Sequence, residues 1–271
     1  MAKKIIKSLV KTIQEKQEFR RAKVFIVSFP KSGRTWLRVL IGKALCEKYG
    51  LDEQLIFDEL KVTEAAGVLP TMYTHDGSSN TEGRHWRDLG AGKTPYQKKK
   101  ILFLIRDPRD VAVSCFFQAT KRKGLYKGTI SDFIRDDCYG IRKIVTFFNI
   151  WHANQHVPEA FLPLRYEEMH ADPAGNIRKA LDFIGAGEVA DEIIRRAVEY
   201  ASFDNMRKLE EEGRFESKKL RPGKSRDEES FKVRKGKVGG FTDYLNAEDC
   251  AYVNGVMREL GCPFFPLESR K

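Results

Sequence analysis

Three separated stretches of this chain combine cations, hydroxyls and glycines in patterns suited to binding phosphate groups. The first, residues 30–36 (PKSGRTW), lies between a short apolar run and a helical pattern. At such a junction the free backbone N–H groups and the helix dipole favour an anion, and a glycine lets the backbone approach it closely. Lys31 can then reach a phosphate oxygen, although the lysine precedes the glycine and the order is not that of a Walker A loop. The alternative is an ordinary strand-to-helix turn with a surface lysine.

The second and third stretches also carry arginines. Arg106 follows the apolar residues 101–105 (ILFLI), and Ser114 comes eight positions later. Since open α/β sheets bind ligands at the carboxyl ends of their strands, this guanidinium and this hydroxyl can share one phosphate. The alternative is an Arg106–Asp110 ion pair at the start of a helix. Residues 234–241 (RKGKVGGF) suit a loop that folds over a phosphate, or a charged loop that faces solvent.

Strands that alternate with helices must position these stretches. The apolar runs at residues 24–29, 101–105 and 161–164 predict three buried strands. Apolar residues at helical spacing predict helices over residues 36–51, 111–120, 130–154, 173–184, 189–200 and 247–260. Alternation of this kind predicts the α/β class, with a single domain whose central parallel sheet is flanked by helices. Residues 77–92 predict a long surface loop, and the highly charged residues 210–229 predict a mobile segment.

Composition restricts the setting in which the protein works. The 271 residues carry a formal net charge of +11, which attracts nucleic acid, acidic membrane or phosphorylated small molecules. The five cysteines form no CxxC pair, which favours a reduced, cytoplasmic compartment over a disulfide framework or a zinc site. No apolar run is long enough to predict a transmembrane helix. The pattern of residues 1–23 predicts a basic amphipathic helix, which either packs on the domain or rests on an anionic membrane. The domain itself is predicted to span residues 24–265.

Together the three stretches resemble the sulfotransferases that use 3′-phosphoadenosine 5′-phosphosulfate (PAPS). The first loop of that family reads PKSGTTW, its second segment places a serine eight residues after an arginine, and its third reads RKGxxGxW. Residues 30–36, 106–114 and 234–241 match these in order and approximate spacing. LRYEEM at residues 164–169 and SFDNM at residues 202–206 resemble stretches that lie near the adenine in the family. The resemblance runs from about residue 24 to about residue 260 and implies a P-loop-like fold.

The resemblance also implies a role for each matching residue. Those implied to surround the 5′-phosphosulfate are Lys31, Ser32, Gly33, Arg34, Thr35 and Trp36. Those implied to hold the 3′-phosphate are Arg106, Ser114, Arg234, Lys235 and Gly236. Those implied to complete the nucleotide pocket are Tyr166, Ser202, Phe203 and Met206.

The chain departs from the family pattern within these stretches. Arg34 stands where the family usually has threonine, and this extra cation either strengthens the grip on the phosphosulfate or binds an acidic acceptor. Gly240 and Phe241 replace the usual aspartate and tryptophan, which leaves the path of the third loop open.

The attacking atom must lose a proton during transfer, and a histidine is a suitable base at neutral pH. In the family the base lies between the first and second motifs, in a THxP-like turn that His75 matches in part. Tyr73 stands where the family has lysine, and the proline is missing. His85, a carboxylate such as Glu64, and a histidine that only packs are the alternatives. His170 is expected on a surface turn.

The predicted activity is transfer of the sulfuryl group of PAPS to an acceptor hydroxyl or amine, with His75 as the base and Lys31 neutralising the bridging oxygen. No metal is required. The acceptor is a small molecule, a glycan or a lipid, and residues 120–128, which are basic, face either an acidic acceptor or solvent. The family's C-terminal dimer motif, KxxxTVxxxE, is not visible, which leaves the oligomeric state open.

Two other functions are compatible with phosphate-binding stretches. A nucleotide or small-molecule kinase also needs a strand, a loop and a helix with arginines, but the Walker order is missing. A non-catalytic nucleic-acid-binding protein fits the net charge of +11, but aromatic and basic residues are not interleaved as single-strand binding requires.

Overall fold

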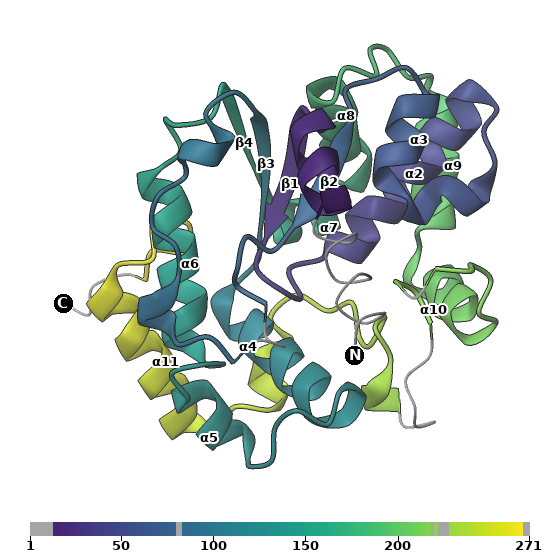
Figure 1. Ribbon diagram of the computed structural model, residues 1–271. Helices are drawn as coiled ribbons and strands as arrows, with labels where there is room; N and C mark the ends of the chain where they lie inside the picture. Colours follow the sequence, from purple (N-terminus) through teal and green to yellow (C-terminus); the bar gives the residue numbers. More distant parts are fainter. Residues whose placement is uncertain (1–12, 80–82, 218, 222–227, 268–271) are drawn as a thin grey trace, which may run out of the picture.

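A four-stranded parallel sheet forms the centre of the computed structural model (Figure 1). The structure describes residues 13–79, 83–217, 219–221 and 228–267. The strands lie in the order β2-β1-β3-β4, and every neighbouring pair is parallel. Their bounds are β1 Val24–Ser28, β2 Thr71–Thr74, β3 Lys100–Ile105 and β4 Ala160–Arg165. Because all four run in one direction, the residues that follow their carboxyl ends meet at one edge of the sheet.

Helices cover both faces of this sheet. Helices α2, α3, α8 and α9 lie on one side of it, and α4, α6 and α11 lie on the other (Figure 1). The helix bounds are α2 Arg34–Tyr49, α3 Glu59–Ala65, α4 Pro108–Phe117, α5 Ile130–Arg135, α6 Ile141–Ala153, α7 Tyr166–Ala171, α8 Pro173–Phe183, α9 Asp191–Tyr200, α10 Phe203–Glu211 and α11 Ala247–Leu260. Shorter helical turns are η1 Glu53–Phe57, η2 Trp86–Asp88, η3 Thr94–Tyr96, η4 Gln118–Arg122, η5 Glu228–Ser230 and η6 Gly240–Asp243.

The central strands are buried on both faces, which explains their composition. In β1, Val24 and Ile26 pack into one core cluster, while Phe25 and Val27 pack into the cluster on the opposite face. Successive side chains of a strand point to opposite faces, so a sheet covered on both sides needs a continuous apolar run rather than an alternating one. The predicted α/β class with a parallel sheet between helices is therefore confirmed.

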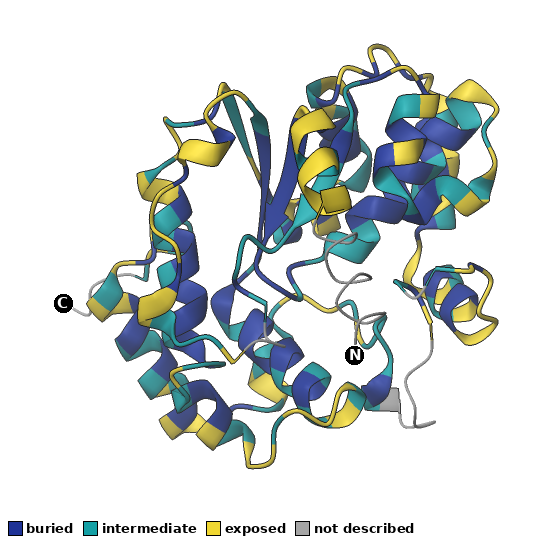
Figure 2. Cartoon of the chain, in the orientation of Figure 1, coloured by how far each residue is buried: buried dark blue, intermediate teal, exposed yellow. Residues whose placement is uncertain are grey.

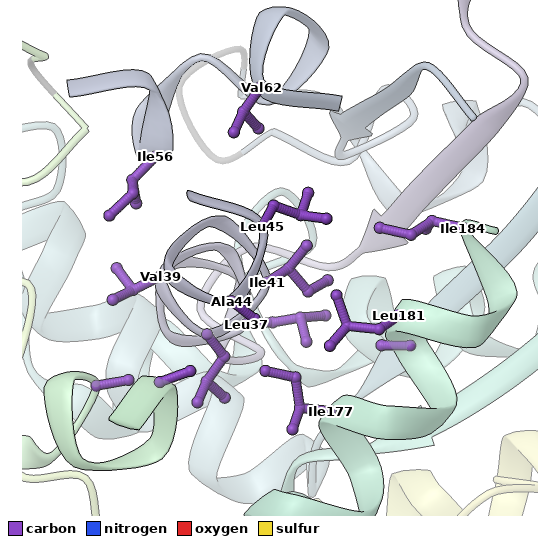
Figure 3. Close-up of a cluster of buried hydrophobic side chains, with 14 of the residues drawn as sticks. Leu37, Val39, Ile41, Ala44, Leu45, Ile56, Val62, Ile177, Leu181 and Ile184 are labelled. Atoms are coloured by element: carbon purple, nitrogen blue, oxygen red, sulfur yellow. The ribbon is translucent and has the colours of Figure 1, made fainter. Parts of the chain in front are cut away.

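Helix α2 is held rigidly in the core. Leu37, Ile41 and Leu45 face Leu181 and its neighbours on α8, while the opposite side of α2 packs against the segment that contains η1 (Figure 3). Burying a leucine or isoleucine side chain stabilises the fold by about 1.5–3 kcal/mol. The start of α2 is therefore fixed at the carboxyl end of β1, where the first phosphate-binding loop was predicted.

The three predicted strands are confirmed as β1, β3 and β4. Sequence prediction misses β2, because Thr71–Thr74 (TMYT) is short and half polar. Its strand conformation depends on pairing with β1, in which Thr74 lies opposite Val27. Strand propensity depends strongly on such neighbours, which a single sequence does not reveal.

The single helix predicted over residues 130–154 is wrong, because a turn separates α5 from α6. The carboxylate of Asp136 accepts hydrogen bonds from the backbone N–H groups of Cys138 and Tyr139 at 2.7 and 3.0 Å. A Cβ atom at Gly140 would lie 2.5 Å from the carbonyl oxygen of Ile134. Side chain–backbone hydrogen bonds of this kind compete with the helical ones and end the helix.

The mobile segment predicted at residues 210–229 is wrong for its first part. Glu210 is fully buried near the end of α10, and Phe215 and Leu220 after it are buried as well. Figure 2 shows buried positions within α10. Residues 218 and 222–227 lie outside the described part of the chain.

The predicted N-terminal helix is only partly described. Residues 13–21 are helical, whereas residues 1–12 lie outside the described residues, so the predicted boundary between this helix and the domain stays a prediction. Within the described ranges, no helix is long and apolar enough to cross a membrane.

Candidate active site

A cavity of about 400 Å³ opens at the carboxyl edge of the sheet. Each strand leads into it: β1 to the first loop, β2 to His75, β3 to Arg106 and β4 to Tyr166. The predicted site residues that line the cavity are Lys31, Gly33, Arg34, Thr35, Trp36, His75, Arg106, Ser114, Tyr166, Ser202, Phe203, Met206, Arg234, Lys235 and Gly236. Ser32 does not line it, because its side chain is fully buried, and its hydroxyl has no hydrogen-bond partner within the described chain.

The first loop has a backbone that few residues tolerate. Gly33 has a φ of 98°, and a Cβ atom there would lie 2.5 Å from Cδ2 of Tyr166, so only glycine fits. Lys31 also adopts a positive φ, of 71°, which is strained for a residue with a side chain. No side chain caps the start of α2 at Gly33, which leaves the first N–H groups of the helix available to an anion.

Lys31 is in an unusual electrostatic setting. Burial lowers the pKa of its ammonium group to about 8, and the Arg122 and Arg106 guanidinium groups contribute to the lowering. A cation held this way gains stability when an anion binds beside it, because the anion restores the interactions that water would otherwise supply.

Arg106 connects all three predicted stretches. Its Nη1 donates to the carbonyl oxygen of Lys31 at 3.3 Å, and its Nη2 donates to the carbonyl oxygen of Lys237 at 3.1 Å. The same guanidinium lies 4.4 Å from the centroid of the Tyr166 ring. It also forms an ion pair with Asp110 at 3.6 Å. The Arg106–Asp110 ion pair, considered above as the alternative to a phosphate site, is therefore present at the cavity as well. The stretches therefore converge through one side chain that faces the cavity.

Asp110 fixes the path of the third stretch. Its two carboxylate oxygens accept hydrogen bonds from the backbone N–H groups of Gly239 and Phe241, both at 2.9 Å. The ring of Phe241 lies 4.3 Å from the guanidinium carbon of Arg109. The loop is therefore anchored through its backbone and needs neither the aspartate nor the tryptophan usual in the family.

Arg234 is positioned by its neighbours at the other side of the cavity. Its Nη1 lies 2.8 Å from Oε2 of Glu229 and 2.7 Å from the hydroxyl of Tyr244. Its guanidinium carbon is 4.4 Å from the centroid of the Phe117 ring. Lys235, next to it, lies 3.6 Å from Asp243. These cations are oriented but remain at the cavity lining, as an anion site requires.

Aromatic rings form an apolar wall, which is part of the cavity lining beside the cations. The rings of Trp36 and Tyr166 meet edge to face at 5.6 Å. Phe203 lies close to the third stretch, where a Cβ atom at Gly236 would be 2.8 Å from its ring. Gly236 has a φ of 61°, so glycine is required there by conformation as well as by space. A planar base fits such a wall.

His75 has one ring nitrogen fixed and the other open to chemistry. Nδ1 lies 2.8 Å from the carbonyl oxygen of Ser28, and since a carbonyl only accepts, Nδ1 carries the proton and donates. Nε2 then holds a lone pair and can accept a proton. Burial, followed by the positive charge of Arg34, holds the pKa of His75 well below 6.5, so the ring is neutral at physiological pH.

The turn after His75 is held by a buried ion pair. Asp76 adopts a positive φ of 45°, and its carboxylate pairs with Lys93 at 2.7 Å and accepts a hydrogen bond from Tyr96 at 3.0 Å. Ser78 donates to the carbonyl oxygen of His75 through its backbone at 2.9 Å and its hydroxyl at 2.6 Å. Strained backbone held in this way is typical of functional sites. Neither Asp76 nor Lys93 was singled out from the sequence.

The alternative bases lie elsewhere. His85 pairs with Asp137 at 3.4 Å, and Glu64 pairs with Arg21 at 2.5 Å, and neither lines the cavity. Within residues 13–79, 83–217, 219–221 and 228–267, no group of three or more His, Cys, Asp or Glu side chains could hold a metal ion.

Comparison with known proteins accounts for the converging stretches. A family model described as "Sulfotransferase domain" matches residues 21–261. The chain belongs to the sulfotransferase family. Cytosolic sulfotransferase 17 of Arabidopsis thaliana is 25% identical over 277 residues, which cover 94% of this chain and 79% of the relative. Flavonol 3-sulfotransferase of Flaveria bidentis is 25% identical over 252 residues, which cover 83% of this chain and 77% of the relative.

Solved structures show the same fold as this sulfotransferase. Mouse sulfotransferase SULT7A1, complexed with PAP, superposes with a TM-score of 0.61 at 23% identity, covering 89% of this chain and 84% of the other. Retinol dehydratase in a complex with retinol and PAP superposes with a TM-score of 0.62 at 17% identity, covering 91% and 82%. At these identities the likeness concerns the fold alone.

This sulfotransferase also has a lysine in its cavity that the sequence did not single out. Lys232 lines the cavity, and its backbone N–H donates to the buried carboxylate of Glu210 at 2.8 Å. Glu210 also pairs with Arg122 at 3.1 Å. Lys232 lies just before the RKG motif in a run of charged residues, so nothing in its local sequence distinguishes it from a surface lysine. Arg122 itself, within the basic residues 120–128, turns inward rather than toward solvent.

His170 is not on a surface turn. It lies in helix α7 and lines the cavity, with its ring centroid 6.3 Å from that of Trp36. Its side chain is still exposed, so it forms part of the rim of the aromatic wall. Helix α7, which carries His170, begins directly after the last residue of β4. The predicted strand ended at residue 164, and no helix was predicted after it, so the position of His170 was missed.

Proposed function

We propose that this chain transfers the sulfuryl group of PAPS to a hydroxyl or amine of a small-molecule acceptor. The observation that carries the proposal is the position of Arg106, whose guanidinium contacts the first and third stretches while facing the same cavity. A cavity lined by both cations and aromatic rings suits an adenine nucleotide with phosphates on both sides of its ribose.

The two ends of the cavity have different roles in this proposal. Residues Arg106, Ser114, Arg234 and Lys235, which we call the donor end, hold the 3′-phosphate. The first loop holds the 5′-phosphosulfate with Lys31, Thr35 and the open N–H groups of α2, and Trp36 and Phe203 lie against the adenine. The region around His75, Arg34 and Lys232, which we call the acceptor end, receives the group to be sulfated.

His75 and Lys31 carry the chemistry. When bound, the donor supplies a sulfuryl group on a phosphate leaving group. Nε2 of His75 accepts the proton of the attacking hydroxyl, and the ammonium of Lys31 neutralises the charge that develops on the leaving phosphate oxygen. An anion bound beside Arg34 offsets part of the positive charge that, after burial, lowers the pKa of His75. The loaded enzyme therefore has a stronger base than the empty one.

The setting of the reaction follows from the relatives and the cysteines. Curated relatives are named for flavonols, and we propose a small-molecule acceptor here. Relatives are also named cytosolic, and the free cysteines within the described residues fit a reducing compartment, so we propose a cytoplasmic location. The domain then spans residues 24–265.

A labelled-donor assay tests the proposed function. The full chain is incubated with PAPS labelled in its sulfate and a panel of phenols, alcohols and amines, and separately with ATP–Mg²⁺ and the same panel. We expect label transfer from PAPS to at least one acceptor and no phosphate transfer from ATP. Adenosine 3′,5′-bisphosphate should also raise the melting temperature more than ATP–Mg²⁺ does. Phosphate transfer from ATP without sulfuryl transfer would contradict the proposal and favour a kinase.

A further inference from the structure

The acceptor end carries more positive charge than the nucleotide needs. Arg34 and Lys232 line the cavity beside His75, and among the described residues neither side chain forms an ion pair with a carboxylate. The cations of the donor end have such partners, since Arg106 pairs with Asp110 and Arg234 with Glu229. Two cations without a carboxylate partner therefore line the same cavity as the proposed base.

The nearby carboxylates are already engaged. Glu59 pairs with Arg38 at 3.3 Å and with Lys219 at 2.6 Å, so it is shared between two other cations. Glu210 accepts from Arg122 at 3.1 Å and from the backbone N–H groups of Lys232 and Val233 at 2.8 and 2.9 Å. Lys232 Nζ donates to a backbone carbonyl oxygen, that of Lys219, at 2.6 Å. The excess charge of Arg34 and Lys232 is therefore not neutralised by these groups.

This arrangement costs free energy in the empty protein. Burial, and then the charge of Arg38, lowers the pKa of Arg34 to about 10. Burial, and then Lys31 and Arg38, lowers the pKa of Lys232 well below its usual range. Uncompensated buried charges are unfavourable unless a ligand of opposite charge binds them. The site therefore favours an anion.

The phosphosulfate does not account for Arg34. The groups whose charges act on Lys31 are Cys115, Arg122, Arg106 and Glu210. Those that act on Arg34 are Arg38 on α2, Glu59 on α3 and Tyr73 on β2. The two sets have no group in common, and Arg34, after burial, is the strongest influence that lowers the pKa of His75, so Arg34 lies near that ring. Tyr73, which does not line the cavity, has a buried hydroxyl without a hydrogen-bond partner within the described chain, and its ring lies 4.3 Å from the Arg38 guanidinium.

We propose that the acceptor carries an anionic group, such as a carboxylate, that binds Arg34 and Lys232 next to the atom that His75 deprotonates. The inference rests on the proposed sulfotransferase function. A guanidinium can hold a carboxylate through two parallel hydrogen bonds, which fixes both the presence and the orientation of the acceptor. Arg34 stands where the family usually has threonine, so this specificity belongs to the chain rather than to the fold.

Pairs of acceptors that differ only in charge test this inference. The probes are para-hydroxyphenylacetate, hydroxyhexanoate and para-(aminomethyl)benzoate, each beside its neutral amide, with PAPS as the donor and the full chain as the enzyme. We expect at least one acid to have a kcat/KM about 10- to 100-fold above that of its amide, the range for a hydrogen-bonded charged group. In Arg34→Met the acid-to-amide ratio should fall to within about threefold of unity, and in Lys232→Met it should fall by less.

The control variant is Arg20→Met, which removes the same charge from an exposed side chain outside the cavity and should keep the ratio of the original chain. Stabilisation by adenosine 3′,5′-bisphosphate shows that each variant is folded. If no acid is sulfated faster than its amide, the inference is wrong. The proposed function still stands in that case, provided that the chain binds the bisphosphate and sulfates other acceptors. An equal loss on both probes in Arg34→Met would assign Arg34 to the phosphosulfate and also overturn it. Absence of both bisphosphate binding and any sulfation would remove the proposed function itself.

Discussion

The donor end and the acceptor end of the cavity differ in whether their cations have carboxylate partners. At the donor end the cations have carboxylate partners: Arg106 with Asp110 at 3.6 Å and Arg234 with Glu229 at 2.8 Å. At the acceptor end Arg34 and Lys232 have none among the described residues. Partnered cations are pre-oriented, and a phosphate that binds them has to share them with an existing carboxylate. A cation without a carboxylate partner is not shared when an anionic group binds it.

The difference indicates where affinity and reactivity arise. Preorganised hydrogen bonding at the donor end fixes the nucleotide in one orientation, which favours specificity. At the acceptor end, burial and then the charge of Arg34 lower the pKa of His75, and the cations there stabilise negative charge on the reacting groups. Variants at the acceptor end and in the first loop should therefore reduce the rate of transfer, whereas variants at the donor end should reduce affinity.

The largest effect is expected for His75→Asn. Without the base, kcat should fall about 10²- to 10⁴-fold, the usual contribution of general base catalysis. The affinity for adenosine 3′,5′-bisphosphate should stay within a few-fold, because His75 contacts the backbone of β1 rather than the donor end. Single-turnover transfer and calorimetric binding measure the two quantities. His156→Asn, at an exposed position outside the cavity, is the matched control, and full activity of His75→Asn would assign the base to another group.

Lys31→Ala should lower kcat about 10²- to 10³-fold, because the developing charge on the leaving phosphate loses its cation. The bisphosphate still meets the donor end and the N–H groups of α2, so binding should weaken much less than transfer. Measuring kcat and the bisphosphate dissociation constant on the same preparation separates the two effects. Appreciable turnover by this variant would reject the role given to Lys31.

Arg234→Ala should affect affinity alone. Loss of this guanidinium should weaken adenosine 3′,5′-bisphosphate about 10- to 100-fold and leave adenosine 5′-monophosphate nearly unchanged, since only the former carries the 3′-phosphate. The loss of affinity should be smaller than for an arginine that pairs with the phosphate alone, because the Arg234 guanidinium already pairs with Glu229. Calorimetric titration of both nucleotides measures it, with Arg20→Ala as the control. Equal weakening of both nucleotides would show that the donor end does not bind the 3′-phosphate.

The smallest effect is expected in the pH profile. His75 must be neutral to act, and its pKa lies well below 6.5, so kcat/KM should rise with pH only in the acid range. Arg34→Met removes a positive charge beside His75, raises the pKa of His75 and should move this acid limb up by about half to one pH unit. Lys31 must be charged to act, so activity should fall as pH rises through about 8, the pKa of Lys31 in the free enzyme. An acid limb that stays in place in Arg34→Met would show that Arg34 does not act on His75.

Sequence was sufficient for those parts of the structure that depend on neighbouring residues. The continuous apolar runs of β1 and β3 and the glycine at position 33 each carry a local signal in the sequence. From such signals the α/β class and most of the residues that line the cavity could be predicted. The missing parts depend on distant partners. Asp110 anchors a loop more than a hundred residues away, and Glu210 holds the backbone of Lys232 from 22 residues away. The turn between α5 and α6 was missed because a single side chain, Asp136, replaces helical hydrogen bonds there.

A crystal structure of the chain with adenosine 3′,5′-bisphosphate tests the central claim most directly. Our account predicts one nucleotide in the cavity, with its 3′-phosphate within hydrogen-bond distance of Arg106 and Arg234 and its 5′-phosphate on Lys31 and the first turn of α2. A nucleotide bound elsewhere, or one whose 3′-phosphate lies beside Arg34 and Lys232 instead, would contradict both the proposed reaction and the division of the cavity into two ends.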